Sequence, residues 1–447
     1  MKFILSIILI LCIPIGLISQ EKGKDIYTLN ECINIAIENN PEILKSNSNL
    51  ESSGADITSA FGNFLPSVDF NMGYSRQLNV EGGRTVNVGG QIIPVPAPNP
   101  NSYQMSAGAN YVIFDGFRRG ANYNRAQNNF DALYASSEHT KSNVINEIYT
   151  KYVEVIKNKQ ILKIRKENLE LGKKQLEQIQ AQFDAGTIHI GAVYSQEADL
   201  GQREFEMVNA ENNLDRSKAE LMTAMGMNPD FSIDFAMESL PQKITENEVD
   251  SFRKNVGSFE AAVQKALSSR KDLIAIDKSI EARESSLTIA ESGYYPSVSA
   301  YGGWSWTNSE LNQFDELGRS YIGLNLRVPV FDNFNTNYQI QNAQAQLQNA
   351  QIDKSHTESL IISYVKLAFL TLESTEKILD ITERSYKAAE INYQSYKERF
   401  DVGKSNITDL LNANNMLVEA QINRVTAVYD YFGAQKNVLF AIGQLER

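Results

Sequence analysis

Four short segments of the chain alternate between apolar and polar residues. A period of two places the apolar side chains on one face of a β-strand and the polar ones on the other. The segments lie at about residues 66–76, 103–114, 296–306 and 320–330, and each is near the length of about ten residues that crosses a bilayer. We therefore predict four membrane-crossing strands. Their predicted lipid-facing side chains are Phe70, Tyr74, Trp304, Trp306, Leu324 and Leu326.

The same alternation also fits a half-buried sheet in a soluble protein. The strand lengths favour the membrane, as do aromatic residues near the strand ends, where interfacial belts lie. Four strands are too few to close a transmembrane β-barrel, because the smallest barrels have about eight. An open edge would leave backbone groups unpaired in lipid, so several chains must share one barrel.

Two long proline-free segments carry an apolar residue at every seventh position. They run from Ala121 to Phe183 and from Asn337 to Phe400, which as helices would span about 95 Å each. A sustained repeat of seven predicts coiled coils. The repeating residues are Val155, Leu162, Leu169, Leu176 and Phe183 in the first segment, and Leu372, Leu379, Tyr386, Tyr393 and Phe400 in the second.

The chain contains two copies of one unit. Leu65-Pro66-Ser67-Val68 matches Tyr295-Pro296-Ser297-Val298 at a spacing of 230, from 66 to 296. Phe114-Asp115-Gly116-Phe117 matches Phe331-Asp332-Asn333-Phe334 at a spacing of 217, from 114 to 331. Each copy is predicted as helix, strand, strand, long helix, turn and helix. The first helix is expected from about Asn30 to Pro66, and the links within the strand pairs are expected to be loops.

The predicted organisation follows from this duplication. A first repeat covers residues 21–226, with a helical hairpin at about 121–226. A linker at 227–257 leads to a second repeat at 258–447, with a hairpin at about 337–443.

The N-terminus and the composition add three constraints. Residues 1–20 have the charged start, short apolar core and small residues of a secretory signal peptide. After its removal Cys32 is the remaining cysteine, so no disulfide within the chain is expected. The formal charge of -12 argues against nucleic acid as a partner.

In their order and duplication these motifs resemble the TolC-type outer-membrane efflux protein family. The segments that carry the resemblance are Leu29-Asn30-Glu31-Cys32-Ile33, Asn40-Pro41-Glu42, both Pro-Ser-Val exits, Phe114-Asp115-Gly116, and the Gly403 to Asp409 turn.

The resemblance implies an α+β membrane protein of the outer membrane. The duplicated helix-strand-strand-helix-helix unit would give each chain four strands in a shared oligomeric β-barrel, continuous with a long coiled-coil α-helical periplasmic tunnel. It implies a homotrimer in outer-membrane lipid that exports substrates. The implied partners are a periplasmic adaptor (membrane fusion) protein and an inner-membrane pump of the RND or ABC type. The linker would lie in an equatorial girdle.

The resemblance also implies two kinds of site at the hairpin tips. The adaptor would contact Gly186, Thr187, Ile188, Gly403, Lys404 and Ser405. The periplasmic gate would be formed by Asp409, Asn412 and Phe400.

The positions of the family's charged latch are different here. They hold Phe400, Ser405 and Ala192, so closure would rest on packing and a ring of Asp409 side chains. Two plainer interpretations stay open: the tip glycines could just turn the chain, and Asp409 could be a helix N-cap.

An enzyme is not predicted. His139, His189 and His356 lie far apart and have no partner at a recognisable metal-ligand spacing, so we expect neither a metal nor another cofactor. The alternative functions are a periplasmic coiled-coil structural or adaptor protein and a passive outer-membrane porin.

Overall fold

The computed structural model describes most of the mature chain. The described residues are 26–79, 83–95, 99–229, 232–241 and 243–445. The predicted signal peptide lies outside them.

The chain forms two compact units, and both repeats contribute to each unit. The first unit contains the described residues of Met1–Ala36, Ile148–Ile244 and Ile381–Tyr429. The second contains Ile37–Glu147, Thr245–Asp380 and the described residues of Asp430–Arg447.

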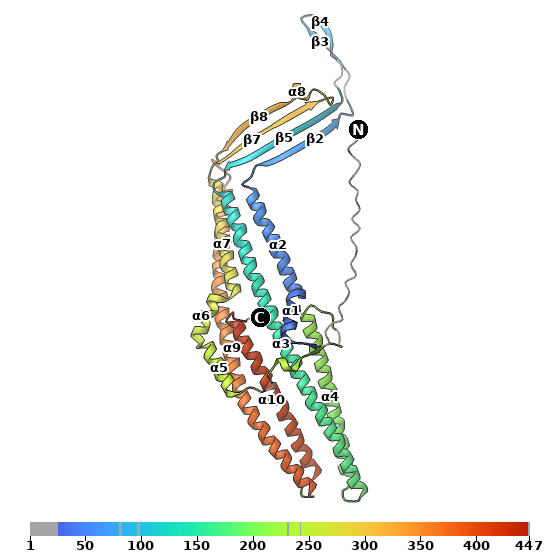
Figure 1. The fold of residues 1–447 in the computed structure, drawn as a ribbon. Helices are drawn as coiled ribbons and strands as arrows, with labels where there is room; N and C mark the ends of the chain where they lie inside the picture. The colour runs from blue at the N-terminus through green and yellow to red at the C-terminus, as the bar shows by residue number, and fades with distance from the viewer. Residues whose placement is uncertain (1–25, 80–82, 96–98, 230–231, 242, 446–447) are drawn as a thin grey trace. The chain divides into compact units, whose positions relative to one another are not determined.

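The second unit carries a four-stranded antiparallel sheet with the order β2-β5-β7-β8 (Figure 1). The strands are β2 (Ser67–Arg76), β5 (Asn101–Phe114), β7 (Ser297–Asn308) and β8 (Arg319–Arg327). They agree closely with the four predicted segments, and β2 and β7 each begin directly after a proline. In this sheet β2 and β8 are the edge strands.

The register places the apolar positions of all four strands on one face. Phe70 lies opposite Ala107, which lies opposite Trp304, while Leu324 lies opposite Ala300. Directly opposed residues of antiparallel strands share a face. The apolar side chains of the two edge strands are strongly exposed, including Phe70 at 67% and Leu324 at 72%.

The prediction that both tryptophans face lipid is wrong for Trp306. Its side chain is 1% exposed, because the short helix α8 (Phe314–Leu317) covers it. The Trp306 and Phe314 rings lie 4.4 Å apart, and the indole Nε1 donates a hydrogen bond to the Gln313 carbonyl at 3.2 Å. In the described chain this side chain is therefore not available to lipid.

The link between β2 and β5 is not the plain loop that we predicted. It contains a hairpin of β3 (Arg84–Val88) and β4 (Gln91–Val95), drawn beyond the ends of β2 and β5 in Figure 1. Gly89 and Gly90 turn the chain with φ of 63° and 91°. Two such glycines favour a two-residue hairpin turn, which gives a local reason for this hairpin.

The helix expected from Asn30 to Pro66 is two helices, α1 (Leu29–Asn39) and α2 (Pro41–Gly62). Asn40 between them has an extended backbone, and its side chain accepts a hydrogen bond from the Glu42 amide at 2.8 Å. Pro41 has no N–H to donate to the preceding turn, so α2 begins at this proline. The second repeat breaks likewise into α6 (Phe259–Ser269) and α7 (Lys271–Glu291).

Four long helices form the two predicted hairpins. They are α3 (Arg118–Asp184) with α4 (Ile190–Ala224), and α9 (Asn335–Asp401) with α10 (Ile407–Ala441). The heptad positions of α3 are buried at Val155, Leu162 and Leu169, and Leu372 of α9 is buried too. Inward packing of these positions explains the repeat of seven.

The helices lack the long apolar stretches of membrane spans. Within the described residues, no helix is both long enough and apolar enough to cross a membrane.

The linker between the repeats is anchored to the first hairpin. It contains β6 (Asp234–Phe235), a 3₁₀ turn (Met237–Ser239) and α5 (Glu246–Val256). The β6 strand pairs in parallel with β1 (Ile26–Tyr27), which the sequence did not predict.

Polar contacts attach β6 to the hairpin helices. The buried Tyr152 hydroxyl donates a hydrogen bond to the Ala236 carbonyl at 2.7 Å. Lys159 of α3 and Lys218 of α4 form ion pairs with Asp234.

The strand-to-helix corners show the duplication in atomic detail. The Arg119 amide donates to the Asp115 carboxylate at 3.0 Å, and the Thr336 amide donates to Asp332 at 2.7 Å. Each aspartate thus satisfies a free N–H in the first turn of a long helix.

The phenylalanines of the corners repeat as well. The Phe114 and Phe117 rings meet edge to face at 5.5 Å, as do Phe331 and Phe334. Motifs 217 residues apart therefore fold in the same way.

Candidate functional site: the hairpin tips

The first hairpin turns at Gly186. This residue has a φ of 73°, which an L-residue rarely adopts. Its amide donates to the Phe183 carbonyl at 2.8 Å, and the Thr187 amide donates to the Gln182 carbonyl at 3.0 Å. This pair of bonds is the Schellman motif, which satisfies free carbonyls at a helix C-terminus.

The second hairpin turns in the same way at Gly403. Its φ is 70°, and its amide donates to the Phe400 carbonyl at 2.9 Å. The Lys404 amide donates to the Arg399 carbonyl at 2.8 Å. A Cβ on Gly186 or Gly403 would meet no atom within 4 Å, so the backbone conformation, not a close neighbour, requires glycine.

Asp409 is not the N-cap of the last helix. The Asn406 side chain caps α10 by accepting from the Asp409 amide at 2.8 Å, which places Asp409 in the third helical position. Its carboxylate accepts a hydrogen bond from the Ser405 hydroxyl at 3.3 Å. Asp409 remains partly exposed, and Asn412 is exposed one turn further along.

An apolar cluster joins the two tips. It brings together Ala192 and Phe400, which occupy two of the three positions of the family's charged latch. Ala192 is buried in this cluster, and Phe400 packs against it. All four hairpin helices contribute, so burial of apolar surface holds the tips together. The buried members are Ile179, Ala192, Val193, Ile407, Leu410 and Leu411, and Leu176, Phe183, Ile188, Tyr393, Tyr396 and Phe400 pack around them.

Sequence reasoning missed most of this cluster. The duplicated sequence did contain a signal for the cluster, because the apolar residues Val193 and Leu410 occupy matching positions, 217 residues apart. Both are buried at the start of the returning helix.

The predicted adaptor-contact residues divide into two groups. Gly186, Thr187, Gly403 and Lys404 are exposed at the tips, whereas Ser405 is half-buried. Ile188 instead packs against the apolar cluster, so much of its side chain faces inward. The Thr187 hydroxyl donates to the Gln182 carbonyl at 2.8 Å, which gives it a structural role in the turn.

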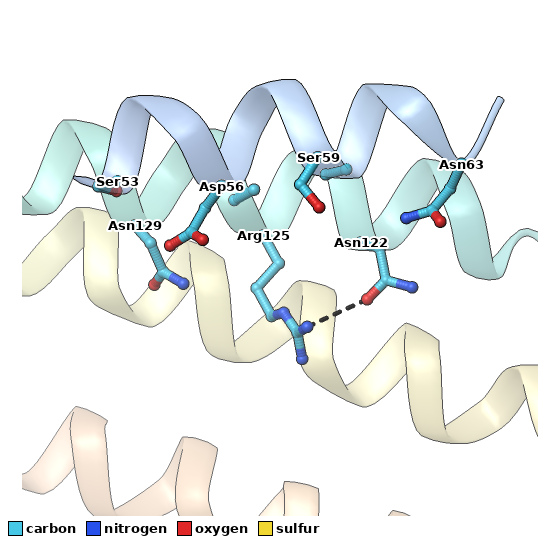
Figure 2. A pocket seen from close by; sticks show the side chains of 9 residues that line it. Ser53, Asp56, Ser59, Asn63, Asn122, Arg125 and Asn129 are labelled. Atoms are coloured by element: carbon cyan, nitrogen blue, oxygen red, sulfur yellow. Dashed lines mark hydrogen bonds between the residues drawn. The ribbon is translucent and has the colours of Figure 1, made fainter. Parts of the chain in front are cut away.

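A polar groove lies between α2 and α3 (Figure 2). It has a volume of about 370 Å³, and the Arg125 guanidinium donates to Asn122 Oδ1 at 3.1 Å along its wall. The second repeat bridges the corresponding space, because Arg283 donates to Gln346 at 3.0 Å. In the first repeat, Ser53 matches Arg283 and is too short to reach across.

The described residues hold no group of three or more histidine, cysteine, aspartate or glutamate side chains placed to bind a metal ion. Cys32 is buried, and burial raises the pKa of its thiol to about 12. A thiol with this pKa stays protonated and unreactive at neutral pH.

Comparison with known proteins identifies one family. The family model for outer membrane efflux proteins matches residues 32–227 and 262–444. The chain is 25% identical over 423 residues to the outer membrane protein TolC of Vibrio cholerae, covering 93% of this chain and 91% of the relative. It is 24% identical over 341 residues to the outer membrane efflux protein BepC of Brucella suis, covering 75% and 71%.

Two solved structures have the same fold. The CmeC outer membrane channel of Campylobacter jejuni gives a TM-score of 0.75 at 18% identity and covers 93% of this chain and 86% of its own. The outer membrane protein VceC of Vibrio cholerae also gives 0.75 at 18% identity, with coverage of 93% and 96%.

We predict that Gly403→Ala loosens the second tip. An L-residue at this φ costs about 1–2 kcal/mol, so amide hydrogen exchange at residues 399–404 should become faster. The matched control is Gly201→Ala, in the middle of α4, where a Cβ also meets open space. There alanine should stabilise the helix by up to about 1 kcal/mol. Equal exchange at the tip in both variants would contradict a conformational role for Gly403.

We predict that Leu410→Ala weakens the contact between the tips. Leu410 is 3% exposed, and truncation of a buried leucine costs about 2–5 kcal/mol. The thermal unfolding midpoint, followed by the helical circular dichroism signal, should fall. Met416→Ala, on the same helix but 59% exposed, should leave the midpoint nearly unchanged. A midpoint unaffected by Leu410→Ala would show that the apolar cluster does not hold the tips.

Proposed function

Because this chain belongs to the outer membrane efflux protein family, and is therefore an efflux channel of the outer membrane, we propose that three copies form one duct. The supporting observation is the open sheet. Among the described residues its edge strands β2 and β8 each pair with one strand only, and its apolar residues share one face.

Pairing of β2 with β8 of a second copy would satisfy both edges. Repeating that contact in a ring closes the sheet, because a head-to-tail interface with the right rotation generates a closed ring. Three copies would give a barrel of twelve strands, within the known range for outer-membrane barrels. The apolar face would then contact lipid, and the polar face would line the duct.

In this proposal the helical hairpins lie in the periplasm. Their tips would be the entrance, and the exposed Thr187, Gly403 and Lys404 would contact a periplasmic adaptor protein that is joined to an inner-membrane pump. Asp409 and Asn412 would line the entrance near the three-fold axis. The apolar cluster at the tips would keep the entrance closed without a charged latch.

We predict that Leu324→Arg impairs insertion into the outer membrane, whereas Asn325→Arg does not. Leu324 lies on the apolar face, and arginine near the bilayer midplane costs about 2–4 kcal/mol there. Asn325 is its neighbour on the polar face. Heat-modifiable trimer in outer-membrane fractions is the readout. Equal loss of trimer in both variants would show that the apolar face does not contact lipid.

We predict that Asp409→Ala weakens block of the duct by multivalent cations. Three Asp409 carboxylates around one axis would attract such ions, because like charges held close together are stabilised by a cation between them. Single-channel recordings in planar bilayers, with cations added on the periplasmic side, measure the block. Asn412→Asp should strengthen it by adding a second ring. Block of unchanged strength in Asp409→Ala would place the constriction elsewhere.

A further inference from the structure

The link between β7 and β8 folds back over the apolar face of the sheet. We call residues 309–318 the α8 link, after the short helix that they contain. Trp304 and Trp306 both lie on the apolar face, because they are opposed to Ala107 and Met105 of β5. The link contacts both tryptophan side chains, so it lies on the apolar face and not on the polar one.

Close contacts hold the α8 link against the two tryptophans. The Phe314 ring lies 4.4 Å from the Trp306 ring, and the Trp306 indole donates to the Gln313 carbonyl. Gly318 lies against Trp304, because a Cβ on this glycine would be 2.5 Å from the indole Nε1 and 2.5 Å from the Phe314 carbonyl oxygen. Real Cβ atoms do not come so close to other atoms. The approach of the link to the sheet therefore requires glycine at this position.

The α8 link covers an apolar surface and presents apolar side chains of its own. Trp306 is 1% exposed beneath the link, whereas Leu311, Phe314 and Leu317 are 52%, 41% and 41% exposed. Phe314 and Leu317 are three positions apart, so they share one side of the helical turn. The two residues between them are acidic and lie elsewhere on that turn. An exposed apolar surface with a polar border marks contact with a membrane or with another protein.

The position of the link along the sheet favours the membrane. β7 follows α7 in the chain and ends at Asn308, so the link lies at the end of the sheet away from α7 (Figure 1). Trp306 follows Val298, the first apolar residue of β7, by eight positions. At about 3.3 Å per residue and a tilt of about 40°, these positions cross about 20 Å of membrane. The apolar band of an outer-membrane barrel is about 25 Å tall, so the link lies near its outer edge.

We propose that the α8 link is a lipid-contact surface that inserts Leu311, Phe314 and Leu317 into the outer leaflet, at the boundary between acyl chains and headgroups. Leucine and phenylalanine beside acidic residues suit this boundary, because one side of the segment is apolar and the other stays in the headgroups. The link rests on the same sheet face that contacts lipid, so the lipid continues onto it. In this respect the inference rests on the proposed function.

Fluorescent probes on single cysteines test this contact. Leu311→Cys and Leu317→Cys, each labelled with an environment-sensitive nitrobenzoxadiazole probe, replace exposed side chains and leave the packed aromatic rings intact. Asp315→Cys is the matched control, because this exposed residue belongs to the same helical turn. The buried Cys32 thiol stays unlabelled.

The labelled oligomers are reconstituted in phosphatidylcholine vesicles with plain or brominated acyl chains. Bromine quenches probes that lie close to the hydrocarbon. Emission from positions 311 and 317 should be blue-shifted and should fall about twofold with brominated chains, because the apolar side of an interfacial segment reaches the acyl boundary. Emission from the Asp315→Cys control should stay nearly unchanged.

Gly318→Ala tests whether packing of the link on the sheet positions this contact. The added Cβ must displace the link from Trp304, so quenching at position 311 should fall toward the level of the control. Gly73→Ala is the matched variant, because a Cβ on this strand glycine meets no atom within 4 Å. It should leave the quenching unchanged.

Three outcomes would overturn the inference. Emission without a blue shift at positions 311 and 317 would place both side chains in water. A blue shift that bromine does not quench would place them against protein, such as the β3–β4 hairpin of a second copy. Quenching that Gly318→Ala leaves unchanged would show that the link does not position the contact.

The proposed function can fail separately. A chain that floats with the vesicles and carries a quenched probe, but is present as a single copy, would contradict the three-copy duct alone. A chain that floats with the vesicles as three copies with an unquenched probe would contradict the lipid contact of the α8 link alone.

Discussion

Backbone hydrogen bonding at the two edges of the four-stranded sheet is the constraint on which the rest of the molecule depends. Within the part of one chain that the structure describes, β2 and β8 each pair on one side only. Their exposed side chains are apolar on one face, with Leu324 at 72% and Phe70 at 67% exposure. Lipid can cover those side chains, but it offers no partner to an unpaired N–H. One chain is therefore an incomplete structure, which further copies can complete.

The duplication of the chain is also visible at the ends of the long helices. Matching corners at Asp115 and Asp332 start the two long helices, and matching glycine caps at Gly186 and Gly403 end them. The two hairpins are nevertheless not equivalent where they meet. Ala192 of the first matches Asp409 of the second, so one returning helix begins with a buried small residue and the other with a partly exposed carboxylate. The two returning helices therefore place different chemical groups at the tips.

The sequence predicted those features that depend on local periodicity, and the family and fold it indicated are confirmed. Strand faces, heptad positions and glycine caps repeat at fixed spacings that can be counted. The break at Asn40 and the hairpin at Gly89-Gly90 also have local signals in the sequence, namely Pro41 and the glycine pair. One unbroken helix and a plain loop were predicted at these places. Burial of Trp306 depends on the short helix α8, which begins eight residues later in a link that was predicted to be a loop. The contact of Asn168 with Asn414 had no local signal, because the two residues lie 246 positions apart.

The copy number of the purified protein tests the central claim most directly. Native mass spectrometry from detergent micelles counts the chains in one particle without assuming a shape. The account predicts three chains, held together by strand pairing between β2 of one copy and β8 of the next. A monodisperse single chain that still conducts in bilayers would contradict it, because four strands would then have formed a membrane channel alone.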